Sequence, residues 1–400
     1  MGDALLSAAP FDPDAATAAY LATLSPAQHE RAIAYTQGGH WLLLWGTLVT
    51  VAAMLLIWRS GLLARFAGRI SGVKARPNLT AFLCTILFFL CDWAIELPWS
   101  IYANWWRERS YGLTAQSFGD WLGEDIMSTA ISIPLLALLA IAIYALMRRT
   151  PRWWWAWSGL VVVVGIVLMV VVAPVTIEPL FNKYTPAPAG PTRDAAVELA
   201  HRAGVPGDKI YIYDGSKQSE RYTANVSGLF GTARVAMSDT MVKQGADLAE
   251  VRGVVGHELG HYAEHHVLWL AGGMSLLAML LFWLVDRLYP TVARWVGAGA
   301  AIGDPAHMPV AWAVAVVVGL FLVPLMNSIS RYDENAADRF SLQIAHEPDG
   351  LAKALVKTIQ YRASSPSRLE EILFYDHPSV ERRIHAAMLW KAQHPDLVGK

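Results

Sequence analysis

Long runs of apolar residues dominate the chain. A helix that crosses the hydrocarbon core of a bilayer needs about 20 mostly apolar residues. Six segments meet this requirement: Trp41–Trp58, Leu79–Trp105, Met127–Met147, Trp153–Val175, Val267–Val285 and Met308–Ile329. The preceding stretch Ala15–Tyr35 carries His29, Glu30 and Arg31 and favours an amphipathic or soluble helix instead. The pattern predicts an α-helical multi-pass membrane protein with about six transmembrane helices.

Two polar regions interrupt or follow the apolar runs. In the first, Lys209–Asp214 predicts a strand, and Ala224–Phe230 with Arg234–Ser238 predicts a hairpin around Gly231-Thr232. Asp247–His266 predicts a helix, so this region should form a small α+β domain. The expected organisation is an N-terminal segment (1–40), a four-span bundle (41–175), the α+β domain (176–266), two further spans (267–330) and a helical C-terminal part (331–400).

Composition supports a membrane-embedded chain in contact with lipids. Hydrophobic residues make up 54% and charged residues 16%, whereas soluble proteins carry about 25% charged residues. The net charge of -1 gives no reason to expect a nucleic-acid partner. Cys84 and Cys91 share one apolar segment and are expected to be packing residues. Asp3, Asp12 and Asp14 replace the basic region of a signal peptide, so none is expected.

Two acidic residues, Asp92 and Glu96, lie within the second apolar run, just before Pro98. Acidic groups at membrane depth are costly and usually face a cavity or a partner. Neighbouring helices could satisfy the pair, or the pair could face a water-filled interior. Both interpretations stay open at this point.

The strongest chemical signal is His257-Glu258-Leu259-Gly260-His261. Residues i and i+4 of a helix lie on one face, so both imidazoles can reach one metal ion. Zinc binds nitrogen, oxygen and sulfur ligands and keeps one position open in catalytic sites. Glu258 adjoins the first ligand and can act as a general base. The motif therefore predicts a zinc peptidase site.

A third ligand must come from another segment. Glu334 and Asp338 follow the last apolar run with i,i+4 spacing. Glu334 is the predicted ligand, and Asp338 would fix a ligand imidazole through its other ring nitrogen. The alternative for this acidic run is a solvated helix start. His265 and His266 are rival ligands, although three histidines on one straight helix cannot surround an ion well.

Several further motifs occur in an order that resembles the Ste24-type CAAX prenyl proteases, membrane metallopeptidases of the M48 class, from about Ala34 to Arg382. The motifs are Glu96-Leu97-Pro98-Trp99-Ser100, Tyr111-Gly112, Pro179–Pro186, Asp214–Lys217, Val226–Leu229, the zinc helix, Glu334–Asp338, His377-Pro378 and Glu381-Arg382. The resemblance implies a helical bundle around a large chamber, one Zn²⁺ per chain, and cleavage near prenylated C-termini. Some family members have broader roles in clearing membrane peptides.

The resemblance also implies roles for single residues. Glu334 matches the third metal ligand and Asp338 the supporting acid. His377 matches a histidine that touches substrate or the oxyanion, and Arg382 an arginine close to the site. For His377, a capping or turn residue before Pro378 is the alternative.

The chain departs from the family pattern in two ways. It has six apolar runs where the family usually has seven spans. The family often has Asn-Ala before an aromatic residue on the strand that pairs with substrate, whereas this chain has Thr223-Ala224-Asn225. Asn225 is the candidate substrate contact, and the edge of the strand can still bind a peptide through main-chain hydrogen bonds.

Loop charges leave the orientation in the membrane open. The segment between the first two spans contains Arg59, Arg65, Arg69, Lys74 and Arg76 and lacks acidic residues. The positive-inside rule assigns such loops to the cytoplasm, and alternation then puts the zinc domain outside. The resemblance implies a cytoplasmic zinc domain. A multi-pass protein of the cell (inner) membrane is expected, with the side of the zinc domain undecided.

The sequence thus predicts a zinc-dependent membrane metalloendopeptidase whose substrate is a peptide or protein, including prenylated C-termini. A broad-specificity protease for membrane-protein quality control is one alternative. A transporter or channel with a non-catalytic metal site is an alternative of another class, based on Asp92 and Glu96 alone.

Overall fold

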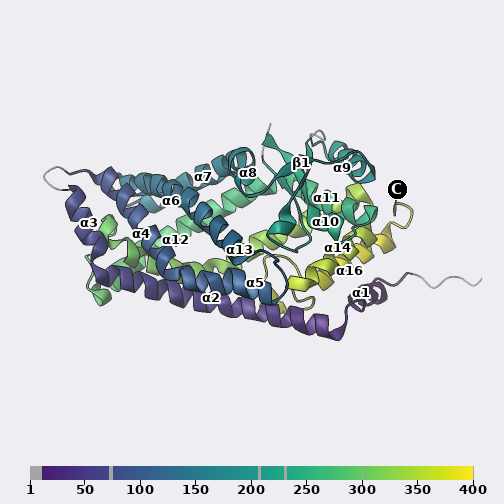
Figure 1. The fold of residues 1–400 in the computed structure, drawn as a ribbon, viewed down its shortest axis with the longest axis horizontal. Coiled ribbons are helices and arrows are strands. Elements are labelled where there is room, and N and C mark those ends of the chain that lie inside the picture. The colour runs from purple at the N-terminus through teal and green to yellow at the C-terminus, as the bar shows by residue number, and fades with distance from the viewer. Residues whose placement is uncertain (1–10, 72–74, 206–208, 229–231, 300, 400) are drawn as a thin grey trace, which may run out of the picture.

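The computed structural model describes residues 11–71, 75–205, 209–228, 232–299 and 301–399. They form an elongated bundle of long helices with a small domain at one end (Figure 1). The α-helices are α1 (Pro13–Leu21), α2 (Pro26–Ser60), α3 (Leu62–Ser71), α4 (Pro77–Ser100), α5 (Arg107–Ser110), α6 (Phe118–Arg149), α7 (Trp154–Thr176), α8 (Glu178–Phe181), α9 (Pro191–Arg202), α10 (Asp239–Lys243), α11 (Leu248–Ala263), α12 (His266–Val296), α13 (Met308–Ala345), α14 (Pro348–Thr358), α15 (Arg368–Phe374) and α16 (Val380–Gln393). The strands are β1 (Tyr184–Pro186), β2 (Ile210–Tyr213), β3 (Ala224–Ser227) and β4 (Arg234–Ser238).

Six helices are long and apolar enough to cross a membrane, which confirms the six predicted spans. They are α2, α4 with its continuation to Ser110, α6, α7, α12 and α13 with the preceding turn. The longest, α13, has 38 residues. At 1.5 Å per residue it is roughly 57 Å long, well beyond the roughly 30 Å of a hydrocarbon core. The predicted last span and the acidic motif that follows it are therefore parts of one continuous helix.

The expectation of one helix over Ala15–Tyr35 is wrong. Helix α1 ends at Leu21, and Ser25 caps a new helix by accepting a hydrogen bond from the Gln28 backbone. This helix, α2, then continues without a break into the first membrane span. Hydrogen bonding by the N-cap side chain satisfies a free helix N–H group and favours a helix start at that position. Helix α1 packs separately against α16.

The small domain contains a four-stranded sheet with the order β1-β2-β4-β3. Strands β2 and β4 are parallel, and the outer pairs are antiparallel. Strand β2 confirms the strand predicted over Lys209–Asp214. Strands β3 and β4 pair as the predicted hairpin, with Ala224 opposite Met237; Gly231, at its expected turn, lies outside the described residues. Strand β3 stands at an edge of the sheet, next to the motif helix α11.

Close packing fixes α11 against α13. An added Cβ on Gly256 would lie 2.9 Å from Ser341 Oγ, and one on Gly260 would lie 3.0 Å from the Ala337 Cα. Such distances exclude a side chain larger than hydrogen unless a neighbour moves. The Ser341 hydroxyl also donates to the Gly253 carbonyl at 2.7 Å. The two helices that carry the motif residues are thus held in one relative position.

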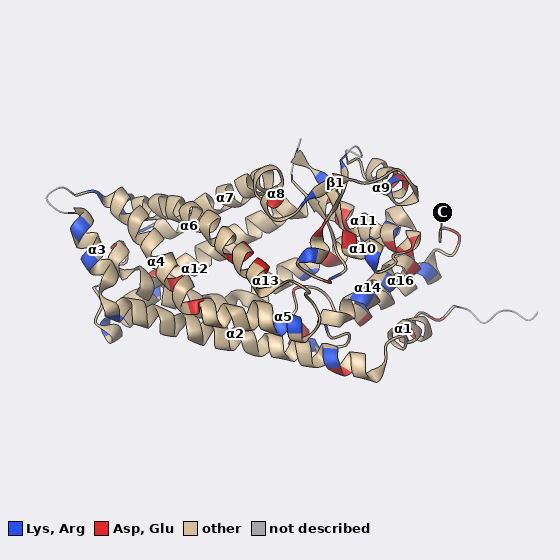
Figure 2. Ribbon diagram, viewed as in Figure 1, with Lys and Arg blue, Asp and Glu red and all other residues tan. Residues whose placement is uncertain are grey.

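Charge is distributed unevenly along the molecule. Most positions of the bundle are neither acidic nor basic (Figure 2). Basic residues occur on α3 at the far end, and the small domain has residues of both charges. The predicted basic loop therefore lies at the opposite end from the small domain.

Candidate active site

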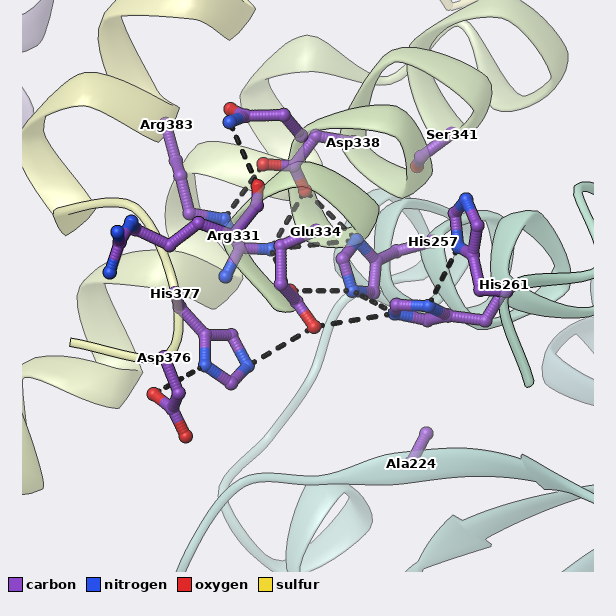
Figure 3. Close-up of polar contacts among 12 residues, drawn as sticks. Ala224, His257, His261, Arg331, Glu334, Asp338, Ser341, Asp376, His377 and Arg383 are labelled. Atoms are coloured by element: carbon purple, nitrogen blue, oxygen red, sulfur yellow. Dashed lines mark hydrogen bonds and ion pairs between the residues drawn. The ribbon is translucent and has the colours of Figure 1, made fainter. Parts of the chain in front are cut away.

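Three predicted ligands converge between α11 and α13. Ligand atoms of His257, His261 and Glu334 all lie within 4.8 Å of one another. The two Nε2 atoms are 3.2 Å apart, and each lies 3.3 or 3.4 Å from a Glu334 carboxylate oxygen. Figure 3 shows the two imidazoles and the carboxylate pointing toward a common centre. The sequence predicted this arrangement from two i,i+4 pairs, which begin at His257 and at Glu334, 77 positions apart (334 − 257).

The far nitrogen of each imidazole has its own partner. His257 Nδ1 lies 2.9 Å from Asp338 Oδ1, and His261 Nδ1 lies 3.0 Å from His266 Nδ1. Contacts of this kind orient metal-binding imidazoles and leave the Nε2 lone pairs for the ion. The structure therefore brings Asp338 to its predicted position and places His266 as a support for His261.

The rival ligand His265 is not part of the group. Helix α11 ends at Ala263, and His265 has a left-handed backbone with φ 56°. The i+4 relation between His261 and His265 therefore does not place the two side chains on one helical face. The break redirects the chain so that His266 can begin α12 beside His261.

An arginine that the sequence analysis missed holds Asp338. Arg383 binds both Asp338 oxygens at 2.7 Å and lies 3.6 Å from Glu334 Oε2. A two-pronged guanidinium–carboxylate contact fixes both geometry and charge. Arg383 is only 7% exposed, so the pair forms a buried support behind the ligands.

The structure does not bring Arg382 into this group, and its neighbour Arg383 lies there instead. Arg382 is exposed and pairs with Glu371 at 3.1 Å. The buried positions of α16 are Val380, Arg383, Ile384, Ala387 and Met388. Arg383 lies on this apolar stripe. A charged residue on an otherwise apolar stripe of a helix indicates a buried, paired charge, and this was the signal in the sequence for Arg383.

Glu258 lies on α11 between the ligands and the edge strand. The Val226 backbone, in β3, favours the ionised form of its carboxylate. Burial raises the pKa of Glu258, while the two ligand histidines oppose that rise. A carboxylate with a raised pKa beside a metal site suits proton transfer near neutral pH. The geometry therefore agrees with the predicted general base.

His377 approaches the ligand group from a different segment. Its Nε2 lies 3.3 Å from Glu334 Oε1, and its Nδ1 lies 2.7 Å from Asp376 Oδ1 (Figure 3). Burial lowers the pKa of His377, and the Asp376 carboxylate acts in the opposite direction. His377 is therefore at the site, as predicted, and Asp376 is a partner that the sequence analysis missed.

The candidate substrate contact Asn225 is not among these residues. Ala224 lies on the face of β3 that is directed toward the ligands (Figure 3), and successive side chains of a strand point to opposite faces. Asn225 therefore points away from the ligands. Its Oδ1 is shielded from solvent and accepts no hydrogen bond from the described residues.

The donor set fits a divalent metal ion. Two imidazole nitrogens and one carboxylate oxygen are typical ligands of zinc and leave a position open. Glu334 Oε2 is buried and accepts no hydrogen bond from the described part of the chain. Burial disfavours a charged His257, yet the carboxylates of Glu334 and Asp338 outweigh it and raise the pKa of His257 to about 10. The site therefore attracts a cation.

Comparisons with known proteins agree with this geometry. The sequence model of peptidase family M48 matches residues 186–391. A second model, the CAAX prenyl protease N-terminal region with five membrane helices, matches residues 14–183. Four of the six membrane-length helices in the described residues fall in that range. Both halves of the chain thus match the same type of protein.

Individual relatives give the same result. An uncharacterized metalloprotease of Bacillus subtilis, YhfN, is 28% identical over 286 residues, covering 69% of this chain and 66% of that protein. The CAAX prenyl protease 1 homolog of Arabidopsis thaliana is 28% identical over 309 residues, covering 73% and 69%. The chain thus spans about two thirds of the length of these curated relatives.

A solved structure extends the likeness to the whole fold. The crystal structure of S. mikatae Ste24p matches with a TM-score of 0.72 at 20% identity and covers 94% of this chain and 95% of that one. Since the M48 sequence model covers more than half of the chain and the ligand set is in place, the chain belongs to peptidase family M48 and is a membrane metalloprotease.

Proposed function

We propose that this chain is a zinc-dependent metalloendopeptidase of the cell (inner) membrane that cleaves peptides close to prenylated carboxyl termini. The observation that supports this function best is the convergence of His257, His261 and Glu334, with Glu258 between the two histidines. Peptide hydrolysis needs a metal, a base and a place for an extended peptide. All three requirements meet at the junction of α11, α13 and β3.

His257, His261 and Glu334 would hold the zinc ion, with Asp338 and Arg383 fixing the ligands from behind. When bound, zinc supplies Lewis-acid activation of water and of the scissile carbonyl. The carboxylate pair at Glu334 and Asp338 gives the site its affinity for a cation. The ion requires no further ligand from the described residues, which leaves room for the reactants.

Glu258 would transfer the proton. It takes a proton from the attacking water as the new C–O bond forms. It then delivers this proton to the amine nitrogen as the C–N bond breaks. Its raised pKa favours both halves of the transfer.

Two further elements would handle the peptide itself. Strand β3 has a free edge in the four-stranded sheet, and an extended peptide can pair with such an edge through main-chain hydrogen bonds. With its Nδ1–H held by Asp376, His377 in its imidazolium form would donate a hydrogen bond from Nε2–H to the carbonyl oxygen as negative charge develops. Binding and charge stabilisation would thus come from different segments of the chain.

The prenylated substrate is suggested by relatives named CAAX prenyl protease 1 in Arabidopsis thaliana and Saccharomyces cerevisiae. A prenyl chain partitions into lipid, and the described part of this chain has six helices long and apolar enough to cross a bilayer. The transporter alternative is not favoured, because the family match is to a peptidase. Broad-specificity cleavage of membrane peptides remains the second candidate, since the same site chemistry would serve it.

The test uses a fluorescent prenylated C-terminal peptide, its unprenylated twin and the purified full chain. Glu258→Gln should keep bound zinc and lose at least about 10³-fold in kcat, given the size of general-base effects. Glu264→Gln, the same change at an exposed position of the same segment, is the matched control and should keep full activity. A chelator should abolish cleavage by the wild-type protein.

Each result separates the candidates. Prenyl-dependent cleavage that chelator and Glu258→Gln abolish would support the proposal. Equal cleavage of both peptides would keep the zinc endopeptidase and favour the broad-specificity role. Full activity of Glu258→Gln would refute the mechanism.

A further inference from the structure

The helix that supplies the third metal ligand also holds the end of a neighbouring helix. Asn327, Arg331, Glu334 and Asp338 recur at i, i+4, i+7 and i+11, so they form one stripe on α13. Glu334 and Asp338 belong to the metal site. Asn327 is 4% exposed, and Arg331 is half-buried. The stripe thus continues from the metal site toward the N-terminus of α13.

Arg331 and Asn327 bind the carbonyl groups at the C-terminal end of α15. Arg331 Nη1 donates to the carbonyl oxygen of Glu371 at 2.9 Å and to that of Tyr375. Asn327 Nδ2 donates to the Leu373 carbonyl at 3.2 Å. The last carbonyls of a helix lack partners inside the helix, and a cation placed there also complements the helix dipole. Two side chains of α13 therefore cap α15.

Arg331 differs from the buried Arg383, whose guanidinium pairs with the Asp338 carboxylate. Arg331 Nη2 donates to Ser328 Oγ at 2.7 Å, and Arg331 forms no ion pair in the residues that the structure describes. Hydrogen bonds from a charged donor are stronger than those from a neutral one. The charge of Arg331 therefore fixes a segment of main chain.

This segment leads directly to His377. Tyr375, whose carbonyl Arg331 binds, lies two residues before His377. On the other side of His377, the N–H of Ser379 donates to Glu371 Oε1 at 3.2 Å. Arg331 thus holds the main chain before His377, and a side chain of α15 holds it after His377.

These contacts set the position of His377 relative to the metal ligands. Arg331 lies three residues before Glu334 on α13, and His377 Nε2 lies 3.3 Å from Glu334 Oε1. One turn of helix therefore connects the anchor of the segment to a metal ligand. From this placement we infer that Arg331 is a positioning residue, which holds His377 where it would meet the developing oxyanion. The inference rests on the proposed peptidase mechanism.

Arg331→Met tests this role, because it keeps an apolar side chain and removes every donor. The freed segment should misplace His377, so kcat for the fluorescent prenylated peptide should fall about 10²-fold while KM stays unchanged. His377→Ala should lower kcat by about 10²–10³-fold, as expected for one oxyanion donor. Arg331→Lys, which keeps a cation for the carbonyls, should retain part of the activity.

A double-mutant cycle separates positioning from a general structural role. In the His377→Ala background, Arg331→Met should cause no further loss in kcat, because the group that Arg331 positions is gone. An equal fold-loss with and without the His377 side chain would overturn the inference, since Arg331 would then act on the fold or on the metal ligands. Full activity of Arg331→Met would also overturn it.

Arg339→Met is the matched control, because Arg339 is an exposed arginine of the same helix. It should keep the wild-type kcat and KM. The Arg331 and Arg339 variants should all bind zinc with wild-type affinity, measured by zinc release to a chelating dye. A loss of zinc in Arg331→Met that accounts for its loss of activity would overturn the inference.

Amide hydrogen exchange tests the anchoring without turnover and without metal. Amides of residues 371–379 should exchange faster in Arg331→Met than in wild type, whereas those of α9 should exchange equally in both proteins. Equal exchange over 371–379 would overturn the inference even in an active peptidase. Faster exchange in a protein whose wild type cleaves no peptide would refute the proposed function and leave the anchoring in place. If Arg331→Met does not fold, Arg331→Lys decides through the same comparisons, with smaller differences expected.

Discussion

Carboxylates occur in two contrasting environments in this molecule. Behind the metal ligands, Asp338 is 5% exposed, and its two oxygens are bound by Arg383 and His257. On α4, Asp92 Oδ1 and Glu96 Oε1 are also shielded from solvent, yet neither has a hydrogen-bond partner in the described residues. Figure 2 shows the acidic segments of α4 within a largely uncharged bundle.

The hydrogen-bond partners of these carboxylates distinguish a group that stabilises the site from groups that face a cavity. A buried carboxylate that is fully paired stabilises one geometry, and removal of a partner leaves an uncompensated charge. A carboxylate without a partner at membrane depth must be protonated or reached by water. Asp338 therefore belongs to the rigid part of the site. Asp92 and Glu96 favour the water-filled interior that was one of two interpretations of the sequence.

The largest effect should come from removing one charge of the paired cluster. Asp338→Asn leaves Arg383 buried without its counter-charge and should lower the free energy of unfolding by about 3–5 kcal/mol. Zinc affinity should also fall by about 10- to 100-fold, because His257 loses the group that orients it. Thermal unfolding in detergent and zinc release to a chelating dye measure the two effects.

Asp92→Asn is the matched control for this substitution. It makes the same chemical change at a carboxylate with a solvent-shielded, unpaired oxygen, and it should change the free energy of unfolding by less than about 0.5 kcal/mol. Equal losses in the two variants would break the distinction between paired and unpaired carboxylates.

The metal site was largely predictable because its spacings are local. The i,i+4 pairs at His257/His261 and Glu334/Asp338 specify one helical face each. When two such helices pack with these faces together, the ligand side chains can be arranged around an ion in only a few ways. The six membrane helices were predictable for a similar reason, since length and hydropathy alone identify a span.

The partners of these groups were harder to predict because they depend on tertiary packing. Arg383 is 45 residues from Asp338, and only its place on the apolar stripe of α16 distinguishes it from Arg382. The capping by Ser25 and the break at His265 are single-residue features that periodicity does not detect. The side of β3 on which Asn225 lies was also hard to predict, because a shift of a strand by one residue exchanges its two faces.

The second prediction tests whether water reaches α4. Asp92→Cys, in a background with Cys84→Ala and Cys91→Ala, should react with a charged, water-soluble thiol reagent. Leu90→Cys is the control, because Leu90 is 46% exposed on the opposite face of the helix and should contact lipid. Asp92→Cys should react about tenfold faster or more, since thiols in apolar surroundings stay protonated and inert. Equal rates would indicate that both faces of α4 meet the same medium.

The smallest effect concerns a carboxylate that is paired but exposed, and it completes the comparison. Asp247 caps α11 and lies 2.6 Å from Lys353 Nζ, with about half of each side chain exposed. The Lys353 hydrogen bond lowers the pKa of Asp247. A lowered folded-state pKa means that the ionised pair stabilises the protein above the unfolded value of about 3.9. That contribution is lost as the pH falls through the folded pKa.

Asp247→Asn keeps a capping side chain and removes the charge. It should cost about 0.2–1 kcal/mol at neutral pH, the range for exposed ion pairs, and the difference from wild type should vanish as the pH is lowered below about 4. Thermal unfolding of wild type, Asp247→Asn, Lys353→Gln and the double variant between pH 7 and pH 3 measures the coupling. A difference that persists undiminished at the lowest pH would mean that the ion pair with Lys353 is not its source. The loss in free energy of unfolding in Asp247→Asn can then be compared with the loss in Asp338→Asn. The difference between the two losses measures how much burial of the paired cation adds.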